Sequence, residues 1–554
     1  YPGGAAQRAS ALSCSAGGAT LTTSASVVMP AATLAAPDSR SGFMFGMPYY
    51  WNIAPNRDAT ITPTVRTRRG IGVETEFRYL EPTDAGRLMF DVLPNDQVAG
   101  RTRHALAFEH SGSAQVLAGG SGLRYQANVL RVSDDDYWKD FPRAVPRTTP
   151  RLLPTDLRAE QDLNTWIGPG HAYLRVQQWQ VLQTTDTSTA IISPYQRSPQ
   201  IGLRVTPNVG QGWQASVETE ANRFTRPDSP AGGQASSALP TGWRLHALGQ
   251  ISRAWVAPGW WFTPKLSFNA ASYALDQSAP GLRSNPGRVI PTFSIDSGMV
   301  FERNVRWFGQ DRRQTLEPRL LYVNTPYRNQ LNLPNFDSAD RDFNLVSLFS
   351  ENSFSGVDRV SDAHQLTLGL STRLYDAATG AQTLRLALGQ RVLFSDQRIT
   401  SNLDANGQAV PLTRRLSDVL LEGSTTLVPN WPLDAAVQYN PDTRRVVRSI
   451  LNARYAPAPF HSINVGYNFS RGLSEQVQVG WQWPLWKGRA APVGAAGGCG
   501  GTLYAVGRLN YSLRDSRMTD SLIGAEYDTG CWIARVVSRS EERRVGKECL
   551  RLCR

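Results

Sequence analysis

The residue types that most often catalyse reactions or bind metals are scattered through this sequence. Its 554 residues include 6 His and 5 Cys, without an HExxH pair and without a CxxC or Cys/His spacing typical of zinc sites. The run Gly168-Pro169-Gly170-His171 is typical of a turn. A lipase-type site would need a Ser, a His and an acid that converge, and no His has such a local signature. The sequence therefore predicts no enzyme, no metal site and no cofactor.

Arginine dominates the charged residues. Of 58 basic residues only four are lysine, and the formal net charge is +12. A guanidinium group suits phosphate and carboxylate recognition, and a basic chain raises nucleic acid as a partner. However, the Arg residues are scattered along the chain, with no basic arm. We therefore expect no nucleic-acid partner, and a coding bias in a GC-rich genome explains the excess of arginine.

Strands would have to position these residues, because an alternation with period 2 runs along the chain from about Asp38. In Trp213–Ala221, Trp213 and Val217 share one face, whereas Glu218 and Glu220 share the other. Ser462–Ser470, Gln476–Trp483 and Leu503–Leu513 alternate in the same way. Helical periodicity is hard to find. The pattern predicts an all-β fold with one polar and one apolar face.

Three features favour a large antiparallel transmembrane β-barrel over a soluble β-rich secreted protein. The alternating segments run for about 9–12 residues, enough to cross a bilayer at a tilt. Aromatic residues gather near segment ends, as in Tyr49–Trp51, Trp260–Phe262 and Trp481–Trp486. Short connections alternate with long polar ones such as Asn324–Asn344. We predict about 24–26 strands, whose lumen must conduct something large, be plugged or house a partner.

Composition predicts three parts of the chain. Residues 1–37 contain Arg8 as the only charged residue and are expected to be a disordered or mis-framed leader. Residues 38–538 form the predicted outer-membrane β-barrel domain. In residues 539–554, Arg539–Cys549 reads RSEERRVGKEC, which resembles translated sequencing-adapter DNA and predicts a non-native tail. On that interpretation the barrel lacks its last one or two strands.

A series of ordered motifs between residues 40 and 538 resembles the LPS-assembly protein LptD family. The first is Pro48–Pro63, PYYWNIAPNRDATITP, followed by Arg69-Gly70 and Glu76–Leu80. The others, in order, are Leu93–Asp96 (LPND), Arg131–Asp134 (RVSD) with Tyr137 and Asp140-Phe141, Met299–Arg303 (MVFER), Gln314–Arg319 (QTLEPR), Pro326–Arg328 (PYR), Gly356–Arg359 (GVDR) and Gly524–Trp532 (GAEYDTGCW).

The resemblance implies a barrel of about 26 strands that inserts lipopolysaccharide into the outer leaflet of the Gram-negative outer membrane. In that family the lipid leaves sideways, between the first and last strands, while its sugars pass through the lumen. The implied partners are lipopolysaccharide, an LptE-type lipoprotein that plugs the lumen, and periplasmic bridge proteins that dock through a jellyroll domain. The alternative is a large porin or receptor that moves solutes axially, which a plug domain or an inward-folded loop would favour.

Pro48 and Pro63 are predicted to form part of the lateral gate. Proline lacks the N–H that a strand ladder needs, so each would remove one bond from the first two strands. Each such bond is worth about 0.5–1.5 kcal/mol in water and more where lipid replaces water. The alternative is that both prolines only end strands or shape turns.

Charged residues on the strands are predicted to line the lumen: Glu302, Arg303, Glu317 and Arg319. Guanidinium groups there could contact the phosphates and carboxylates of lipopolysaccharide. The favoured interpretation is structural, with these residues pairing across neighbouring strands.

A disulfide between Cys499 and Cys531 is also predicted. The family commonly carries a Cys-Cys pair near the end of the barrel, and here Gly530-Cys531 occupies that place. Leu503–Leu513 and Asp520–Asp528 predict a hairpin, about which the two cysteines are symmetric. Both would lie in the oxidising periplasm. A free Cys531 is the alternative.

Overall fold

The computed structural model describes most of the chain, as two units. The described residues are 33–38, 41–115, 122–141, 151–183, 191–226, 239–276, 285–307, 309–404, 409–488, 501–528 and 533–541. The first unit takes the described residues up to Ser111 together with those from Leu130 to Phe141, and the second takes the rest.

The first unit is an antiparallel sheet with one short helix. Its elements are β1 (Thr33–Asp38), β2 (Gly42–Gly46), β3 (Tyr49–Ala54), β4 (Arg57–Arg66), β5 (Gly70–Leu80), β6 (Asp84–Asp96), most of β7 (Arg101–Ala114) and α1 (Tyr137–Asp140). β1 pairs with β2, β4 pairs with both β2 and β3, and β5 lies between β4 and β6.

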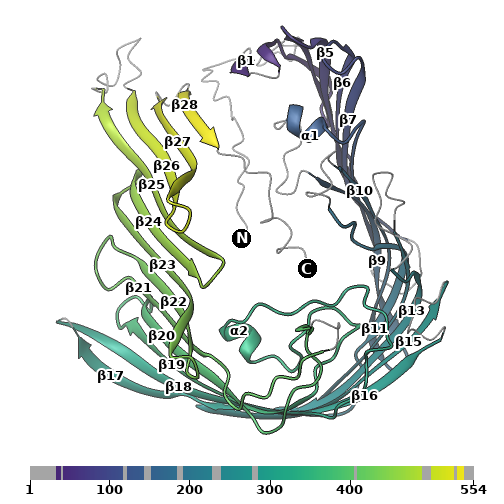
Figure 1. Ribbon diagram of the computed structural model, residues 1–554, viewed down its shortest axis with the longest axis vertical. Coiled ribbons are helices and arrows are strands. Elements are labelled where there is room, and N and C mark those ends of the chain that lie inside the picture. The colour runs from purple at the N-terminus through teal and green to yellow at the C-terminus, as the bar shows by residue number, and fades with distance from the viewer. Residues whose placement is uncertain are drawn as a thin grey trace, which may run out of the picture. The chain divides into compact units, whose positions relative to one another are not determined.

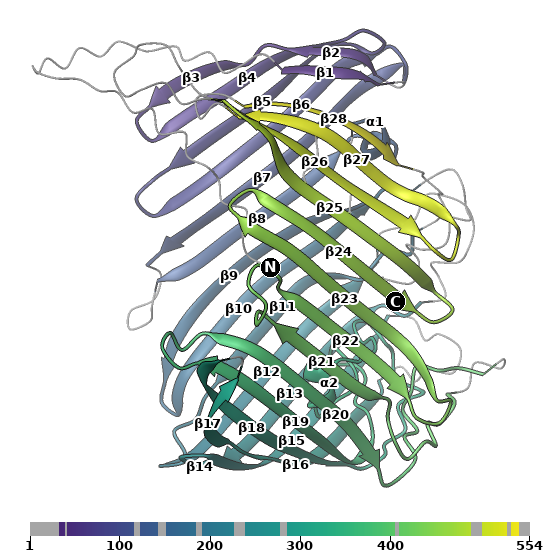
Figure 2. The same ribbon diagram turned by 90° about the vertical axis from the view of Figure 1, so that its left-hand side faces the viewer.

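The second unit is a long antiparallel meander. It contains most of β8 (Leu123–Val132), then β9 (Leu152–Thr165), β10 (Gly168–Val181), β11 (Gln196–Val205), β12 (Trp213–Thr225), β13 (Gly242–Arg253), β14 (Trp255–Ala257), β15 (Trp260–Leu275), β16 (Gly287–Met299), β17 (Phe301–Trp307), β18 (Gln310–Thr325), α2 (Leu345–Leu348), β19 (Ala363–Asp376), β20 (Gln382–Leu393), β21 (Val419–Thr425), β22 (Leu433–Asn440), β23 (Arg445–Ala458), β24 (His461–Ser470), β25 (Ser474–Lys487), β26 (Thr502–Ser512), β27 (Arg517–Asp528) and β28 (Ile533–Glu541). Neighbouring strands run side by side at a common tilt (Figure 2).

Three breaks divide what are otherwise continuous strands. β2 and β3 pair with β4 in one register, β13 and β14 pair with β15 in one register, and β16 and β17 do the same on β18. The 28 segments in the described residues therefore make 25 strands, because each of the three breaks joins two segments into one. This agrees with the predicted number of about 24–26, and the predicted all-β antiparallel fold is confirmed.

The alternating segments predicted from the sequence are strands. Trp213–Ala221 lies in β12, Ser462–Ser470 in β24 and Gln476–Trp483 in β25. The predicted hairpin is formed by β26 and β27, with Ser512 paired to Arg517 and Thr502 to Asp528. Among the described residues, no helix has both the length and the hydropathy to cross a membrane.

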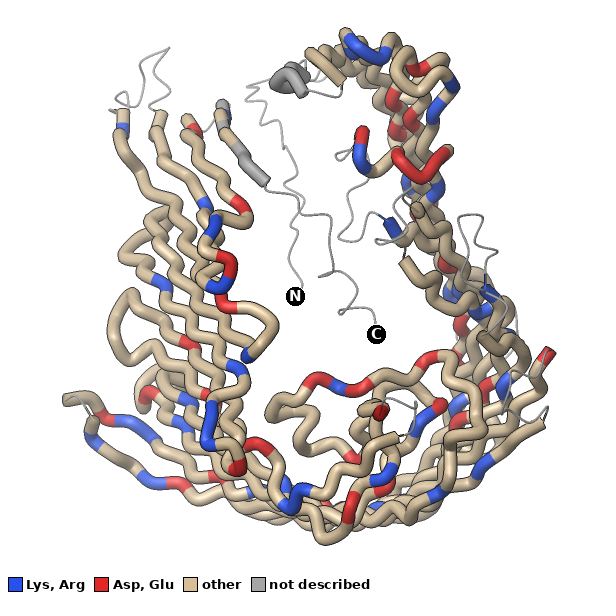
Figure 3. The backbone as a smooth tube through the Cα atoms, in the orientation of Figure 1, with Lys and Arg blue, Asp and Glu red and all other residues tan. Residues whose placement is uncertain are grey.

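The two faces of the second unit are inverted relative to a soluble sheet. In β13 the apolar side chains of Trp243 and Leu245 are 42% and 60% exposed. The polar side chains of Arg244 and His246, which alternate with them, are only 1% and 4% exposed. We call the side of Arg244 the polar face and the side of Leu245 the apolar face. The inversion continues on β16, where Val289 is exposed and Arg288 is buried. Charged residues of both signs are spread along the strands (Figure 3).

One long connection folds back over the polar face. Residues 326–362, between β18 and β19, lie with α2 on the concave side of the curved strands β9–β28 (Figure 1). Leu345 and Leu348 of α2 pack against Ala387 and Leu420 of β20 and β21. The opposite ends of the strands carry short turns, such as 166–167 and 258–259.

The predicted division of the chain at residues 37 and 538 stays a prediction. β1 begins at Thr33, within the predicted leader, and β28 ends at Glu541, within the predicted tail. The remaining residues of the leader and the tail lie outside the described residues.

Candidate functional site

The strand formed by β2 and β3, which follows β1, is interrupted where the sequence predicts a gate. Pro48 lies between β2 and β3, and Pro63 lies inside β4. Gly46 faces Thr64 and Tyr49 faces Ile61, so the register runs unbroken across the gap.

Pro63 weakens the contact between these strands. Met47 N–H donates to the Pro63 carbonyl over 3.1 Å. In an antiparallel ladder such a pair normally exchanges two bonds, but Pro63 has no N–H to return to Met47. One ladder bond is therefore missing at the centre of this strand pair, and Pro63 acts within a strand rather than ending one.

Pro48 affects the other edge of the same strand. Bonded positions alternate along a strand, and Met47 bonds toward β4, so the nitrogen of Pro48 points away from β4. That edge is the one on which β1 pairs, with Gly46 facing Thr33 as the last pair. Pro48 thus follows the end of the β1 ladder and offers no donor there.

A buried ion cluster holds the segment around α1 to the first unit. Arg69 contacts Asp96 at 2.7 Å and Asp140 at 3.0 Å. Arg103 contacts Asp140 at 2.6 Å and Asp134 at 2.8 Å. Both Arg side chains are at most 2% exposed. Charges so deeply buried are stable only when paired and hydrogen-bonded. Here Arg69 has two carboxylate partners, and Arg103 has three because it also contacts Asp96 at 3.3 Å.

Aromatic rings complete this first cluster. The guanidinium groups of Arg66, Arg69 and Arg103 lie 5.1, 5.2 and 4.9 Å from the centre of the Phe141 ring. The Tyr137 hydroxyl donates to Asp91 over 2.7 Å. Burial raises the pKa of Tyr137, so the hydroxyl stays protonated and keeps donating.

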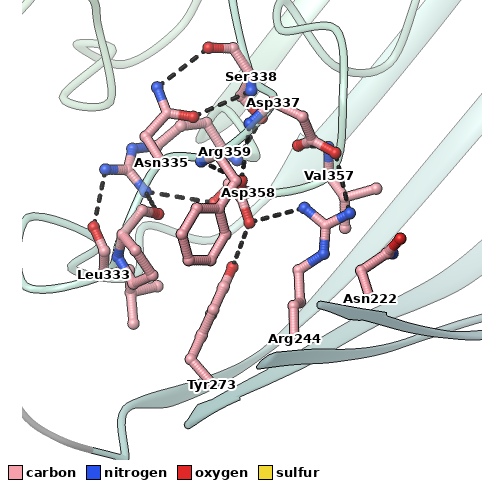
Figure 4. Close-up of polar contacts among 12 residues, drawn as sticks. Asn222, Arg244, Tyr273, Leu333, Asn335, Asp337, Ser338, Val357, Asp358 and Arg359 are labelled. Atoms are coloured by element: carbon pink, nitrogen blue, oxygen red, sulfur yellow. Dashed lines mark hydrogen bonds and ion pairs between the residues drawn. The ribbon is translucent and has the colours of Figure 1, made fainter. Parts of the chain in front are cut away.

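A second buried cluster anchors the long connection 326–362 to the polar face of the second unit (Figure 4). Arg244 Nη1 donates to Asp358 over 2.9 Å, and Arg244 Nη2 donates to Asp337 over 2.9 Å. Asp358 also accepts from the Tyr273 hydroxyl at 2.8 Å and from the Phe336 N–H at 2.6 Å. Arg244 and Tyr273 come from β13 and β15, so two strands hold one loop.

The second cluster balances its own charge. Asp337 accepts from Arg244, from Arg197 at 3.3 Å and from the Val357 N–H at 3.0 Å. Burial alone would raise the pKa of Asp337, but the bonding and charge of Arg244 hold that pKa well below its usual range. Phe224 stacks on Phe336 at 4.3 Å, and this apolar contact excludes water from the ion pairs.

Each of the four predicted lumenal residues has a partner on a neighbouring strand. Arg319 binds Asp296 through two bonds of 3.0 and 2.7 Å, and Glu317 pairs with Arg373. Glu302 lies 4.0 Å from Arg313, and Arg303 donates to Gln314 over 2.8 Å.

They do not, however, share one face. Glu302 is in register with Thr315 and therefore shares the face of Glu317 and Arg319, whereas Arg303 is in register with Gln314 on the opposite face. The prediction that groups Arg303 with the other three is wrong, because adjacent residues of a strand point to opposite sides.

The predicted Cys499–Cys531 disulfide, and the alternative of a free Cys531, lie outside the described residues. The two ion clusters were missed by sequence reasoning, although their residues stand in the motifs quoted above. Asp96, Asp134 and Asp140 belong to the first cluster and Asp358 to the second. The motifs contain these aspartates, but several of the pairs join residues far apart in the sequence, such as Arg244 and Asp358, 114 residues apart.

Comparisons with known proteins agree with this architecture. The profile of the family described as LPS transport system D matches residues 103–487. The LPS-assembly protein LptD of Paracidovorax citrulli is 44% identical over 510 residues, which are 90% of this chain and 60% of the relative. That of Acidovorax sp. (strain JS42) is 44% identical over 532 residues, 93% and 62% of the two chains. That of Burkholderia pseudomallei is 38% identical over 509 residues, 89% and 59%. The chain thus spans about 60% of the length of these relatives.

Proposed function

The chain belongs to the LPS transport system D family, and from this premise we propose that it inserts lipopolysaccharide into the outer leaflet of the Gram-negative outer membrane. It does so as an integral β-barrel translocon, by moving the lipid without making or breaking a bond. The observation that carries the proposal is the inverted sheet, with Leu245 exposed on one face and Arg244 buried on the other. Strands of this kind suit a bilayer outside and a polar interior.

The two faces fit the two parts of an amphiphilic cargo. Sugars and phosphates need hydrogen-bonding partners, which the polar face supplies on neighbouring strands β9 and β10. There Arg175 pairs with Asp156, and His171 contacts Asp162 at 2.8 Å. Passage of the acyl chains along the polar face would cost free energy, because polar groups there would lose their hydrogen-bonding partners to apolar contacts. The acyl chains therefore need a lateral exit into the membrane.

We propose the strand pair around Pro48 and Pro63 as one side of that exit. The missing donor of Pro63 lowers the cost of separating β4 from the strand before it, and Pro48 removes a donor from the opposite edge. Lipid supplies no water that could hydrogen-bond the backbone groups of an opened strand edge. A seam with fewer ladder bonds therefore opens at a lower cost in free energy.

The proposed partners follow from the same function. They are lipopolysaccharide as cargo, an LptE-type lipoprotein that plugs the lumen, and periplasmic proteins that deliver the lipid through a jellyroll domain. The lumenal residues Glu302, Glu317 and Arg319 are proposed to act by pairing across strands, since Arg319 is already held by Asp296.

Depletion in cells tests the proposal. When the native copy of the gene is shut off, newly made lipopolysaccharide should stop reaching the cell surface and accumulate inside the cell, while a plasmid-borne full-length copy restores surface delivery. Continued delivery after depletion would contradict the proposal.

A large porin or receptor that moves solutes axially remains the second candidate function, because the connection 326–362 folds inward over the polar face. A porin would show solute conductance in planar bilayers that rises when this connection is released, and its loss would leave lipopolysaccharide delivery unchanged. We favour the translocon, because the family match covers most of the strands.

A further inference from the structure

Arg253 is a cation on the apolar face of the second unit. It is the last residue of β13, and it shares the side of Trp243, Leu245 and Ile251, all of which are exposed. A charged side chain on a lipid-facing surface is costly at the middle of a bilayer and nearly free only close to its edge. Arg253 meets this condition, since only Ala254 and the three residues of β14 separate it from the 258–259 turn at the end of its strand.

Two tryptophans hold the Arg253 guanidinium. The Cζ atom of Arg253 lies 5.5 Å from the centre of the Trp213 ring and 5.1 Å from the centre of the Trp255 ring. Trp213 faces Arg253 directly across the ladder. Such cation–π contacts position the guanidinium without neutralising its charge. Within the part of the chain that the structure describes, no carboxylate lies within ion-pair distance of Arg253.

An apolar groove adjoins this cation. It is a shallow, open groove of about 430 Å³, lined by Trp255, Trp260, Phe262 and Ser297. Trp255 therefore forms one wall of the groove and one side of the Arg253 contact. The Ser297 hydroxyl is engaged, because it donates to the Trp261 carbonyl over 2.9 Å. An unpaired cation beside an apolar groove is complementary to an anionic amphiphile.

We propose that Arg253, Trp213 and Trp255 bind the phosphate of a bilayer phospholipid whose acyl chain lies in the groove. The proposal rests on the proposed function only in requiring that the apolar face lie in a membrane. Short turns of outer-membrane barrels face the periplasm, and the 258–259 turn is of this kind. The occupant is thus a phospholipid of the periplasmic leaflet, which an Arg binds through two parallel hydrogen bonds.

Native mass spectrometry of the full-length protein, titrated with phosphatidylglycerol in detergent, tests this site. The Arg253→Gln variant should bind phosphatidylglycerol about tenfold more weakly, as expected for the loss of a charge-assisted bidentate contact. The Arg253→Lys variant should show an intermediate affinity, because it keeps the charge but loses the planar fork.

Arg471→Gln provides the matched control. Arg471 also lies over an aromatic ring, Phe469 at 5.5 Å, but its Nε donates to the Val446 carbonyl at the opposite strand end. This variant should bind phosphatidylglycerol like the wild type. Each variant is first checked for the heat-dependent shift in gel migration that marks a folded barrel, and a misfolded Arg253→Gln is replaced by Trp255→Leu.

Three outcomes would overturn the proposal. They are equal phosphatidylglycerol binding by the Arg253→Gln variant and the wild type, an equal loss in the Arg471→Gln control, and a loss of lipopolysaccharide binding in place of phospholipid binding. Failure of the proposed function is a different result, since lipopolysaccharide delivery would then continue after depletion, whatever the variants bind.

Discussion

At the scale of single residues, buried Arg–Asp pairs determine where the long connection lies. Arg244 is 1% exposed and bonds two carboxylates of the connection 326–362. Breaking a buried ion pair by removing one partner leaves charge without compensation, which typically costs about 3–5 kcal/mol. Removal of Arg244 should therefore loosen this connection.

The Arg244→Gln variant should release the connection. Asp337 and Asp358 would lose their shared cation, and limited proteolysis of the folded protein should cut within residues 326–362 at least tenfold faster. The Arg328→Gln variant is the control, because among the described residues Arg328 bonds only the carbonyl of its neighbour Tyr327. Equal cleavage rates for Arg244→Gln and the wild type would show that the connection is held in another way.

Acid should loosen the same connection. The pKa of Asp337 is lower in the folded protein than in an unfolded chain, so its stabilising effect is complete above the unfolded value of about 3.9. The effect is lost as the pH falls below that value toward the folded pKa. The hydrogen-exchange protection factors of residues 326–362, which correct for the pH dependence of intrinsic exchange, should thus be constant from pH 7 to 5 and fall below about pH 4. In Asp337→Asn this fall should shrink, and a fall between pH 7 and 5 would contradict the assignment.

The sequence could not predict these clusters, although it contains their motifs. Asp358 lies 114 residues from Arg244, and Asp134 lies 31 residues from Arg103. No local pattern joins residues so distant, and several Arg residues were available to each Asp. The register of the strands decides which of them meet.

At the scale of elements, alternation predicted the strands because one face must differ from the other along the whole length of each strand. The strands β12, β24 and β25 and the β26–β27 hairpin follow the predicted segments. The inward course of 326–362 was not predictable, because it has no period and is fixed by tertiary contacts of Leu348 and Asp358.

Replacing both Pro48 and Pro63 by alanine should strengthen the first strands and slow lipopolysaccharide delivery. The backbone N–H that Pro63→Ala restores would donate to the Met47 carbonyl, a bond worth about 0.5–1.5 kcal/mol in water and more in lipid. Hydrogen exchange of β2 and β4 should slow, and surface lipopolysaccharide should fall.

Pro55→Ala serves as the control for this pair, since Pro55 lies in the turn between β3 and β4. It should leave both measurements unchanged. Normal lipopolysaccharide delivery in the double variant, despite slower exchange, would refute the role of the prolines as a gate.

At the scale of the whole molecule, a basic chain of 554 residues with 41% apolar residues first suggests several soluble domains. The inverted faces of β13 and β16 explain this composition better. Half of each strand must be apolar to face lipid and half polar to face the interior, so a moderate apolar fraction is expected of a membrane β-protein.

We propose that lipopolysaccharide leaves beside the strands β2–β4, and photo-crosslinking in living cells tests this exit. A photoreactive amino acid replaces Met47, which is 48% exposed next to Pro48, or Trp166 in the β9–β10 turn as the control. During active export, illumination should link lipopolysaccharide to position 47 and not to position 166. Export that continues with no adduct at position 47 would contradict the account.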